Sequence, residues 1–164
     1  MSETLPDKES VLREMAGHPA VAALTAWNPE AFQDARWDRD ELTLTIAREE
    51  IANAGRAVQQ AGYNFLEDVT AVDWFPASPR FQISYHIVSH KFKERIRLRA
   101  LVDDTIPSLP SIVPVWPSAN YYEREVFDLF GVRFEGHPNL RRIMMPEEWQ
   151  GHPLRKDYPV EGYR

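Results

Sequence analysis

The placement of proline restricts the last third of this 164-residue chain more than any other feature. Eight of the 13 prolines lie between Pro107 and Pro159. Proline has no backbone N–H and a fixed φ, so it interrupts helices and central strands. We therefore expect residues 107–164 to form one short helix and an extended partner-binding tail, and residues 1–106 to form an α+β domain that presents them.

Regular elements are predicted upstream of these prolines. Helical spacing of apolar residues predicts one or two short helices between Ser10 and Trp27, and another helix over Arg48–Ala61 that ends at Gly62. The dipeptide His18-Pro19 would separate the first two. Alternating apolar and polar residues predict four strands: Glu41–Ile46, Asn64–Phe75, Arg80–Val88 and Lys91–Val102.

The predicted fold is therefore α+β, with a two-layer N-terminal domain in which helices cover a mainly antiparallel or mixed sheet. The strand over Asn64–Phe75 carries apolar residues on both faces, so we expect it to be largely buried, with Asp68 and Asp73 in need of partners. Arg95, Arg97 and Arg99 share one face of the last strand. They would bind an acidic partner or a phosphate, or form cross-strand ion pairs, and we favour the ion pairs because such charges are commonly solvated.

A short helix is predicted from near Pro117 to Gly131. Ser118 or Asn120 would cap it, with Glu123 three residues after Asn120 as in a capping box. Arg124 and Asp128 are spaced i, i+4 for an ion pair. Glu125 and Asp128 also have a spacing that acid–base or metal chemistry uses, although this spacing is common.

Two similar motifs follow the helix: Gly136-His137-Pro138-Asn139-Leu140-Arg141 and Gly151-His152-Pro153-Leu154-Arg155. Imidazole and carboxylate groups are common metal ligands, so either histidine could bind a metal ion together with Asp128 or Asp157. Because both histidines precede proline, which favours an extended or turn backbone, we interpret them instead as turn residues with local hydrogen bonds.

Basic pairs and aromatic residues alternate in the same region. Arg141-Arg142 and Arg155-Lys156 are interleaved with Met144-Met145, Trp149 and Tyr158, a composition typical of interface hot spots. We expect that an extended, proline-rich segment cannot bury these groups against itself and lies along another protein. On this interpretation Arg141→Ala or Arg142→Ala weakens assembly without lowering the melting temperature.

Composition and missing motifs exclude several functions. The chain has no cysteine, which excludes disulfides, zinc–thiolate sites and an all-cysteine iron–sulfur cluster. A net charge of −6 disfavours nucleic-acid binding. The sequence shows no signal-peptide pattern, no apolar run long enough to span a membrane, and no GxGxxG, GxxxxGK[ST] or GxSxG motif. No catalytic, cofactor-binding or metal-binding residue is predicted.

A family resemblance rests on residues of the helix and of the motifs that follow it. Glu123-Arg124-Glu125, Asp128, Gly131, Phe134 and the run from Gly136 to Ile143 resemble the signature of the 30-kDa subunit, also called the C subunit, of the proton-pumping NADH:quinone oxidoreductase, respiratory complex I. Supporting matches include Thr70-Ala71-Val72-Asp73, Arg80-Phe81, Tyr85, Arg95-Ile96, Trp116-Pro117, Ala119-Asn120 and the closing run from Gly151 to Pro159. The match covers about residues 62–159.

The resemblance implies a peripheral-arm subunit without flavin or iron–sulfur centres, whose tail extends over the 49-kDa quinone-site subunit. The whole complex passes electrons from NADH through FMN and iron–sulfur clusters in other subunits to a quinone, and couples this to proton translocation. The isolated chain is then not catalytic, lies at the cytoplasmic face of the cell inner membrane, and meets the membrane only through the complex.

The residues expected to contact partner subunits all lie between positions 123 and 158. They are Glu123, Arg124, Glu125, Asp128, Gly131, Phe134, His137, Pro138, Leu140, Arg141, Arg142, Trp149, His152, Arg155, Lys156, Asp157 and Tyr158. Membrane-bound hydrogenases and formate hydrogenlyases contain a related domain, so an equivalent subunit of such a complex is an alternative. A stand-alone metal-dependent enzyme that uses Glu125, Asp128, His137 and His152 is another.

Overall fold

The computed structural model describes residues 7–163. In chain order the helices and strands are α1 (Lys8–Glu14), α2 (Pro19–Trp27), β1 (Phe32–Asp38), β2 (Glu41–Ile46), α3 (Ile51–Ala61), β3 (Phe65–Asp73), β4 (Phe81–Ser89), β5 (Glu94–Val102), β6 (Ser108–Pro110), α4 (Ala119–Phe130) and β7 (Arg133–Glu135). Short 3₁₀ turns precede β1 and α3. The predicted α+β class is confirmed.

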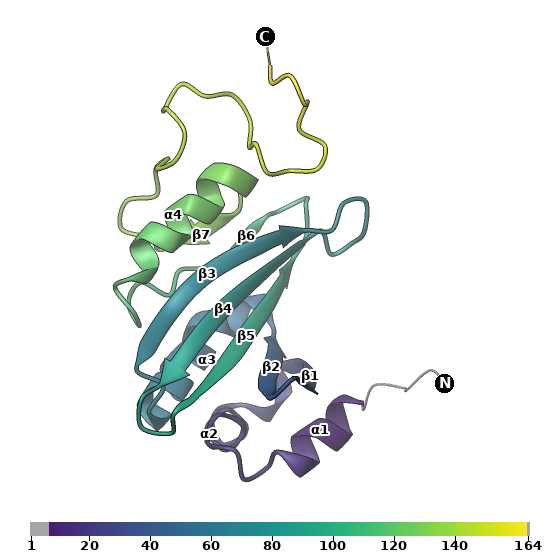
Figure 1. Ribbon diagram of the computed structural model, residues 1–164, viewed down its shortest axis with the longest axis vertical. Coiled ribbons are helices and arrows are strands. Elements are labelled where there is room, and N and C mark those ends of the chain that lie inside the picture. The colour runs from purple at the N-terminus through teal and green to yellow at the C-terminus, as the bar shows by residue number, and fades with distance from the viewer. Residues whose placement is uncertain (1–6, 164) are drawn as a thin grey trace.

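Five strands form a mixed sheet in the order β1-β2-β5-β4-β3. Strands β2 and β5 are parallel, and the other neighbouring pairs are antiparallel. In Figure 1, α3 lies behind β4 and β5, whereas α4 lies beside β3 near the C-terminal end of the chain. The sheet thus carries α4 and the residues that follow it at one end of the molecule.

The hydrophobic core lies between the sheet and helices α2 and α3. Most apolar residues of β2, β4 and β5 are buried, in alternation along β5 as its two-residue period predicts, whereas β2 is buried continuously from Leu42 to Ile46. Helix α3 contributes Ile51, Ala54 and Val58 to the same cluster. Helix α3 ends at Gly62, whose φ of 121° is accessible to glycine at little cost. The predicted helix and its stop are confirmed.

The N-terminal region adopts the two-helix alternative. The His18 side chain accepts a hydrogen bond from the Ala20 N–H (3.3 Å), and Pro19 occupies the first turn of α2. Strand β1 was not predicted. It pairs with β2 through a turn at Arg39 and Asp40, which have φ values of 51° and 61°. Two-residue hairpins need such values and usually use glycine or asparagine for them, so this hairpin lacks its usual sequence signal.

Strand β3 is buried on one face only, which corrects the expectation of two buried faces. Leu66 and Val69 are buried, but Phe65 and Val72 are 49% and 38% exposed. The register shift between Leu66 and Asp68 interrupts the two-residue alternation, so Leu66 and Val69, which are three residues apart, are both buried.

The two aspartates of β3 find partners, as expected. Asp68 contacts His86 (2.5 Å), and Asp73 contacts Arg80 (2.9 Å).

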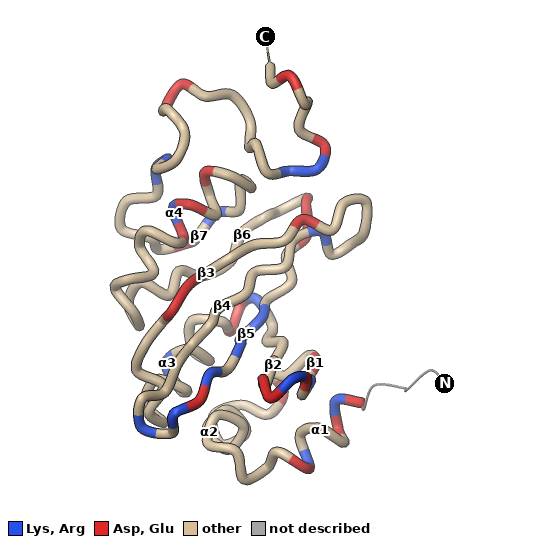
Figure 2. Tube along the Cα trace, viewed as in Figure 1, with Lys and Arg blue, Asp and Glu red and all other residues tan. Residues whose placement is uncertain are grey.

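The three arginines of β5 form cross-strand ion pairs, as predicted. Arg95 and Arg97 contact Glu41 (2.9 and 2.6 Å), and Arg99 contacts Asp34 (3.2 Å). These basic residues follow one another along β5 in Figure 2.

After β5 the chain contains more regular structure than predicted. Strands β6 and β7 form a small parallel pair that no sequence pattern predicted. Helix α4 ends at Gly131 as predicted, and Ser118 holds its N-cap position but makes no side-chain capping bond, while Asn120 lies inside the helix. The predicted capping box is absent, because Glu123 is buried and accepts hydrogen bonds from Ser111 Oγ (2.6 Å) and the Ile112 N–H (2.7 Å). Glu123 therefore holds the preceding loop to the helix.

No helix within residues 7–163 combines the length and apolar character that crossing a membrane requires.

Candidate functional site

The C-terminal segment, defined here as residues 136–163, turns back over the end of α4 (Figure 1). Its polar side chains and backbone bind α4 and the end of β3. The expectation that this segment cannot bury its basic and aromatic groups against its own chain is wrong for Arg142 and Arg155, whereas Arg141, Trp149 and Lys156 are exposed. Backbone carbonyls of α4, which a sequence pattern does not reveal as partners, accept several of these bonds, and the carboxylates of Asp128 and Asp73 accept others.

Asp128 is the first of two anchors for the C-terminal segment. One oxygen of its buried carboxylate, Oδ2, accepts the N–H groups of Ile143 (2.9 Å), Met144 (2.7 Å) and Met145 (2.8 Å). The other oxygen accepts Arg142 Nη1 at 2.6 Å. Burial by itself raises the pKa of Asp128, but these hydrogen bonds outweigh it and hold the pKa below its usual value. The predicted i, i+4 pair with Arg124 is wrong, because Arg142 takes that place.

Arg142 joins α4 to the turn that follows it. Besides Asp128, its guanidinium donates to the carbonyls of Trp149 (2.8 Å) and Gly151 (3.0 Å). The side chain is only 15% exposed. Arg142 is thus an internal anchor rather than an outward-facing residue, which contradicts the expectation that Arg142→Ala would leave folding stability unchanged.

The C-terminal segment also completes the carbonyl end of α4. His152 Nδ1 donates to the Asp128 carbonyl (2.9 Å), the Leu154 N–H to the Leu129 carbonyl (3.0 Å), and Arg155 Nε to the Phe130 carbonyl (2.6 Å). Helix ends leave such carbonyls without partners, and they favour cations. Burial and the nearby charges of Arg155 and Arg142 lower the pKa of His152, so its ring is neutral at pH 7.

The prediction of turn residues with local hydrogen bonds is confirmed for His137 but not for His152, whose ring bonds to α4 at a separation of 24 residues. In the first motif His137 Nδ1 accepts the Asn139 N–H (3.0 Å), while Nε2 contacts the Asn120 carbonyl (3.1 Å). In the second motif, the ring of His152 packs against Gly131, where a Cβ atom would lie 2.6 Å from it.

A second anchor, which was not predicted as a site, lies at the ends of β3 and β4. Buried Arg80 donates to Asp73 (2.9 Å), Asp104 (3.0 Å) and Asp157 (2.6 Å). Asp73 also accepts the Lys156 N–H (2.8 Å). Burial of Asp73 opposes its ionisation, but the bonds from Arg80 and from backbone N–H groups lower its pKa to about 2. The sequence signal for this site was an arginine at the first position of the predicted strand Arg80–Val88.

The remaining predicted interface residues divide between the interior and the surface. Glu123, Gly131 and Phe134 are buried within the chain, and Leu140 packs against its core, so these four serve the fold. Arg124 donates to the carbonyls of Arg141 (3.2 Å) and Arg142 (3.1 Å). Exposed positions are Glu125, Pro138, Arg141, Trp149, Lys156 and Asp157, whereas Tyr158 is half-buried.

Apolar side chains of the C-terminal segment point to solvent while its polar groups point inward. The exposed apolar residues are Ile143, Met144, Trp149, Leu154, Val160 and Tyr163, of which only Trp149 was among the predicted contacts. A segment that exposes this many large apolar side chains is a candidate for protein–protein contact. We call these six residues the apolar surface.

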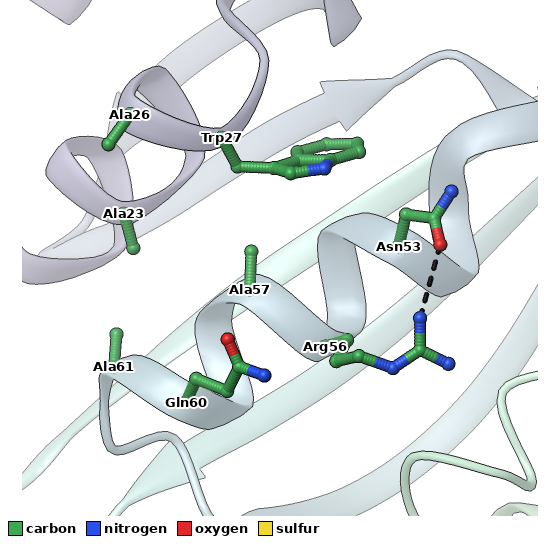
Figure 3. Close-up of a pocket in the computed structure, with 8 residues that line it drawn as sticks. All are labelled: Ala23, Ala26, Trp27, Asn53, Arg56, Ala57, Gln60 and Ala61. Atoms are coloured by element: carbon green, nitrogen blue, oxygen red, sulfur yellow. Dashed lines mark hydrogen bonds between the residues drawn. The ribbon is translucent and has the colours of Figure 1, made fainter.

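Other parts of the described chain offer little for catalysis. Within residues 7–163 there is no group of three His, Cys, Asp or Glu residues placed to hold a metal ion. A hollow of about 440 Å³ between α2 and α3 is lined by small residues and by Trp27, and Figure 3 shows its one charged lining residue, Arg56, bonded to Asn53 (3.2 Å). This hollow brings no acid and base together.

The family model and the similar sequences found among known proteins name the same subunit. The family model described as "Respiratory-chain NADH dehydrogenase, 30 Kd subunit" matches residues 44–164. The NADH-quinone oxidoreductase C subunit of Geobacter sulfurreducens is 48% identical over 145 residues, covering 87% of this chain and 90% of that protein. The protein of the same name from Roseiflexus sp. (strain RS-1) is 44% identical over 140 residues, covering 84% and 80%.

Two solved structures share the fold. The trypsin-resistant fragment (1–134) of Nqo5 is 30% identical and superposes with a TM-score of 0.64, covering 79% of this chain and 99% of the fragment. A chain of the membrane-bound sulfane sulfur reductase, an archaeal respiratory membrane complex, superposes with a TM-score of 0.74 at 24% identity, covering 88% of this chain and 86% of that one. At this identity the likeness shows a shared fold alone. The family model and the similar sequences agree, and the chain belongs to the family of the 30-kDa subunit of respiratory-chain NADH dehydrogenase, the C subunit of NADH-quinone oxidoreductase.

Proposed function

We propose that this protein is a subunit without redox centres in an NADH:quinone oxidoreductase of the complex I type, and that its C-terminal segment binds the 49-kDa quinone-site subunit. The names of its relatives support membership of such a complex. The geometry of the C-terminal segment supports the role of a docking surface.

The observation that carries this proposal is the separation of polar and apolar groups in the C-terminal segment. Asp128, Arg142 and Arg80 hold the backbone from inside, while Met144 is 61% exposed and Val160 fully exposed. A surface that is already ordered loses less conformational entropy on binding, which strengthens an interface of a given area. The segment therefore presents an apolar surface in a fixed shape.

In this role the electron-transfer chemistry belongs to other subunits. FMN and the iron–sulfur clusters would be held there, since this chain has no cysteine to ligate an all-cysteine cluster. The isolated chain would be without catalytic activity, and the complex would translocate protons. The protein would reach the membrane through its partners, at the cytoplasmic face.

Two matched variants test the docking surface. Ile143→Asp places a charge on the apolar surface, whereas Ile106→Asp makes the same change at an exposed isoleucine outside the C-terminal segment. Each variant is co-expressed with the 49-kDa homologue from the same genome, and the complex is measured by affinity purification and by titration of purified chains. We expect Ile143→Asp to weaken binding at least tenfold, about 1.4 kcal/mol or more, and Ile106→Asp to leave it unchanged.

Equal loss of binding in both variants, or no binding of the unaltered chain, refutes the proposed contact. Circular dichroism of both variants shows whether either substitution unfolds the domain. The alternative role in a hydrogenase-type complex predicts co-purification of a nickel-site large subunit in place of NADH-oxidising subunits. The family match favours the NADH-dependent complex.

A further inference from the structure

A hollow of about 420 Å³ lies at the end of the C-terminal segment, between the turn at residues 146–150 and the last described residues. Its lining residues are Pro146, Glu148, Trp149, Gln150, Tyr158, Glu161, Gly162 and Tyr163. We propose that this aromatic hollow binds a cationic side chain, foremost arginine, of a partner protein. The inference deepens the proposed function and rests on it only for the statement that the partner is a protein subunit.

Three aromatic rings give the hollow its affinity for a cation. Trp149 and Tyr163 are 40% and 58% exposed, and Tyr158 is half-buried. The rings of Tyr158 and Tyr163 meet edge-to-face, with centroids 5.3 Å apart and planes at 86°. The faces of aromatic rings are electron-rich and attract ammonium and guanidinium groups, most strongly in tryptophan.

The charges around the hollow have the complementary sign. Among residues 7–163, the lining residues that ionise other than tyrosine are Glu148 and Glu161, and none of these described lining residues is Lys or Arg. The structure gives the Glu148 side chain no hydrogen bond or ion pair within residues 7–163. Arg142 lies behind the backbone here, but its guanidinium is engaged by Asp128 and by the carbonyls of Trp149 and Gly151.

The hollow is formed before any partner arrives. Gly151 has a φ of 74°, and a Cβ atom there would lie 2.7 Å from the ring of Tyr163 and 2.8 Å from that of Tyr158. Both tyrosines therefore pack where only glycine leaves room. The Tyr158 hydroxyl donates to the Gln150 carbonyl (3.3 Å), and the Gly162 N–H donates to the Pro159 carbonyl (3.0 Å), which fixes the turn that brings Tyr163 back.

Arginine fits these features better than the other cations. Its planar guanidinium stacks on an aromatic face while its N–H groups bind a carboxylate, and Trp149 and Glu148 are neighbours in the lining. The hollow also adjoins the apolar surface, of which Trp149 and Tyr163 are members. A basic side chain on the partner's contacting face would thus enter the hollow as the two apolar surfaces meet.

Fluorine NMR of the full chain labelled with 5-fluorotryptophan tests the inference directly. The protein has five tryptophans, and Trp149→Phe assigns the resonance of interest. The probes are acetyl-arginine amide and acetyl-citrulline amide, which has nearly the same shape without the charge. We expect arginine to shift the Trp149 resonance in the millimolar range and citrulline to have little effect. Equal shifts with both probes, or none with arginine, overturn the inference.

Variants separate the hollow from general surface charge. Glu148→Gln and Tyr163→Leu should each weaken arginine binding, by about threefold and about fivefold. Glu147→Gln removes the same charge one residue outside the lining and should change nothing. An equal effect of Glu147→Gln and Glu148→Gln overturns the inference. The other four tryptophan resonances report whether a variant is folded.

The titration with free arginine remains informative whatever the 49-kDa subunit does. A Trp149 response without binding of that subunit refutes the proposed function and leaves the cation site standing. Binding of that subunit with unaltered affinity in Glu148→Gln and Tyr163→Leu, and no Trp149 response to arginine, refutes the cation site alone.

Discussion

Replacing Asp128 with asparagine should detach the C-terminal segment from α4. The buried carboxylate accepts three backbone N–H groups on one oxygen and Arg142 on the other. Asparagine has a single acceptor oxygen. If that oxygen faces the three N–H groups, its NH₂ group meets Arg142, and in the flipped orientation the NH₂ group meets the three N–H groups. Either way at least one buried donor loses its acceptor.

The loss can be estimated from these contacts. A hydrogen bond to a charged group contributes about 1.5–3 kcal/mol, and leaving one partner of a buried charge pair alone costs about 3–5 kcal/mol. We expect about 3 kcal/mol, because the shape of the side chain is retained. The core cluster draws only Leu140 from the described part of the C-terminal segment, so the loss should appear as local opening of residues 136–163 rather than as unfolding of the sheet.

Hydrogen exchange measures this opening residue by residue. The N–H groups of Ile143, Met144 and Met145 should lose most of their protection in Asp128→Asn, while those of β4 and β5 keep theirs. Glu125→Gln, an exposed substitution on the same helix with the same change in charge, is the control and should exchange like the unaltered chain. Unchanged protection at residues 143–145 in Asp128→Asn would refute the role given to this carboxylate.

Three further outcomes are expected. Burial raises the pKa of Glu123 to about 7, from about 4.5 in the unfolded chain. The protonated side chain therefore contributes its full stability below pH 4.5, and this stability is lost as the pH rises through 7. In urea unfolding at pH 8, Glu123→Gln should be about 3 kcal/mol more stable than the unaltered chain, and at pH 4 it should be no more stable. The low pKa of Asp73, about 2, stabilises the fold above its unfolded value near 4 and this is lost toward pH 2, so Asp73→Asn should cost about 2–3 kcal/mol at neutral pH and much less in acid. Gly131→Ala should lower stability by about 1–3 kcal/mol because φ is 76° and the added Cβ would meet His152, whereas Gly17→Ala, with open space around it, should not.

Elements whose residues repeat with a regular period could be predicted from the sequence. Strands β2, β4 and β5 alternate over six to nine residues, and α3 carries an apolar stripe that ends at Gly62. Strand β1 was not predicted, because its hairpin turn uses Arg39 and Asp40 rather than glycine. Strands β6 and β7 are three residues each and pair across the whole of α4, so local sequence contains no period to detect.

The candidate site was predictable in its location but not in its orientation. The density of Arg, His and aromatic residues after α4 marked the correct segment, and the family resemblance came from the same residues. Which side chains face inward depends on backbone carbonyls at the end of α4, and these exist as acceptors only once the helix has formed. For this reason Arg142 and Arg155 were assigned to a partner, whereas they bind within the chain.

The ion-pair cluster around Arg80 restricts which substitutions can be accepted at its positions during evolution. The carboxylates of Asp73, Asp104 and Asp157 share the buried guanidinium of Arg80, from which they lie 7, 24 and 77 residues away in the sequence. Loss of the arginine would leave carboxylates crowded together, and loss of a carboxylate would leave part of the arginine unpaired. Accepted substitutions at these positions should therefore arise in combination, and related sequences should show correlated replacements that link the end of β3 with the last residues of the chain.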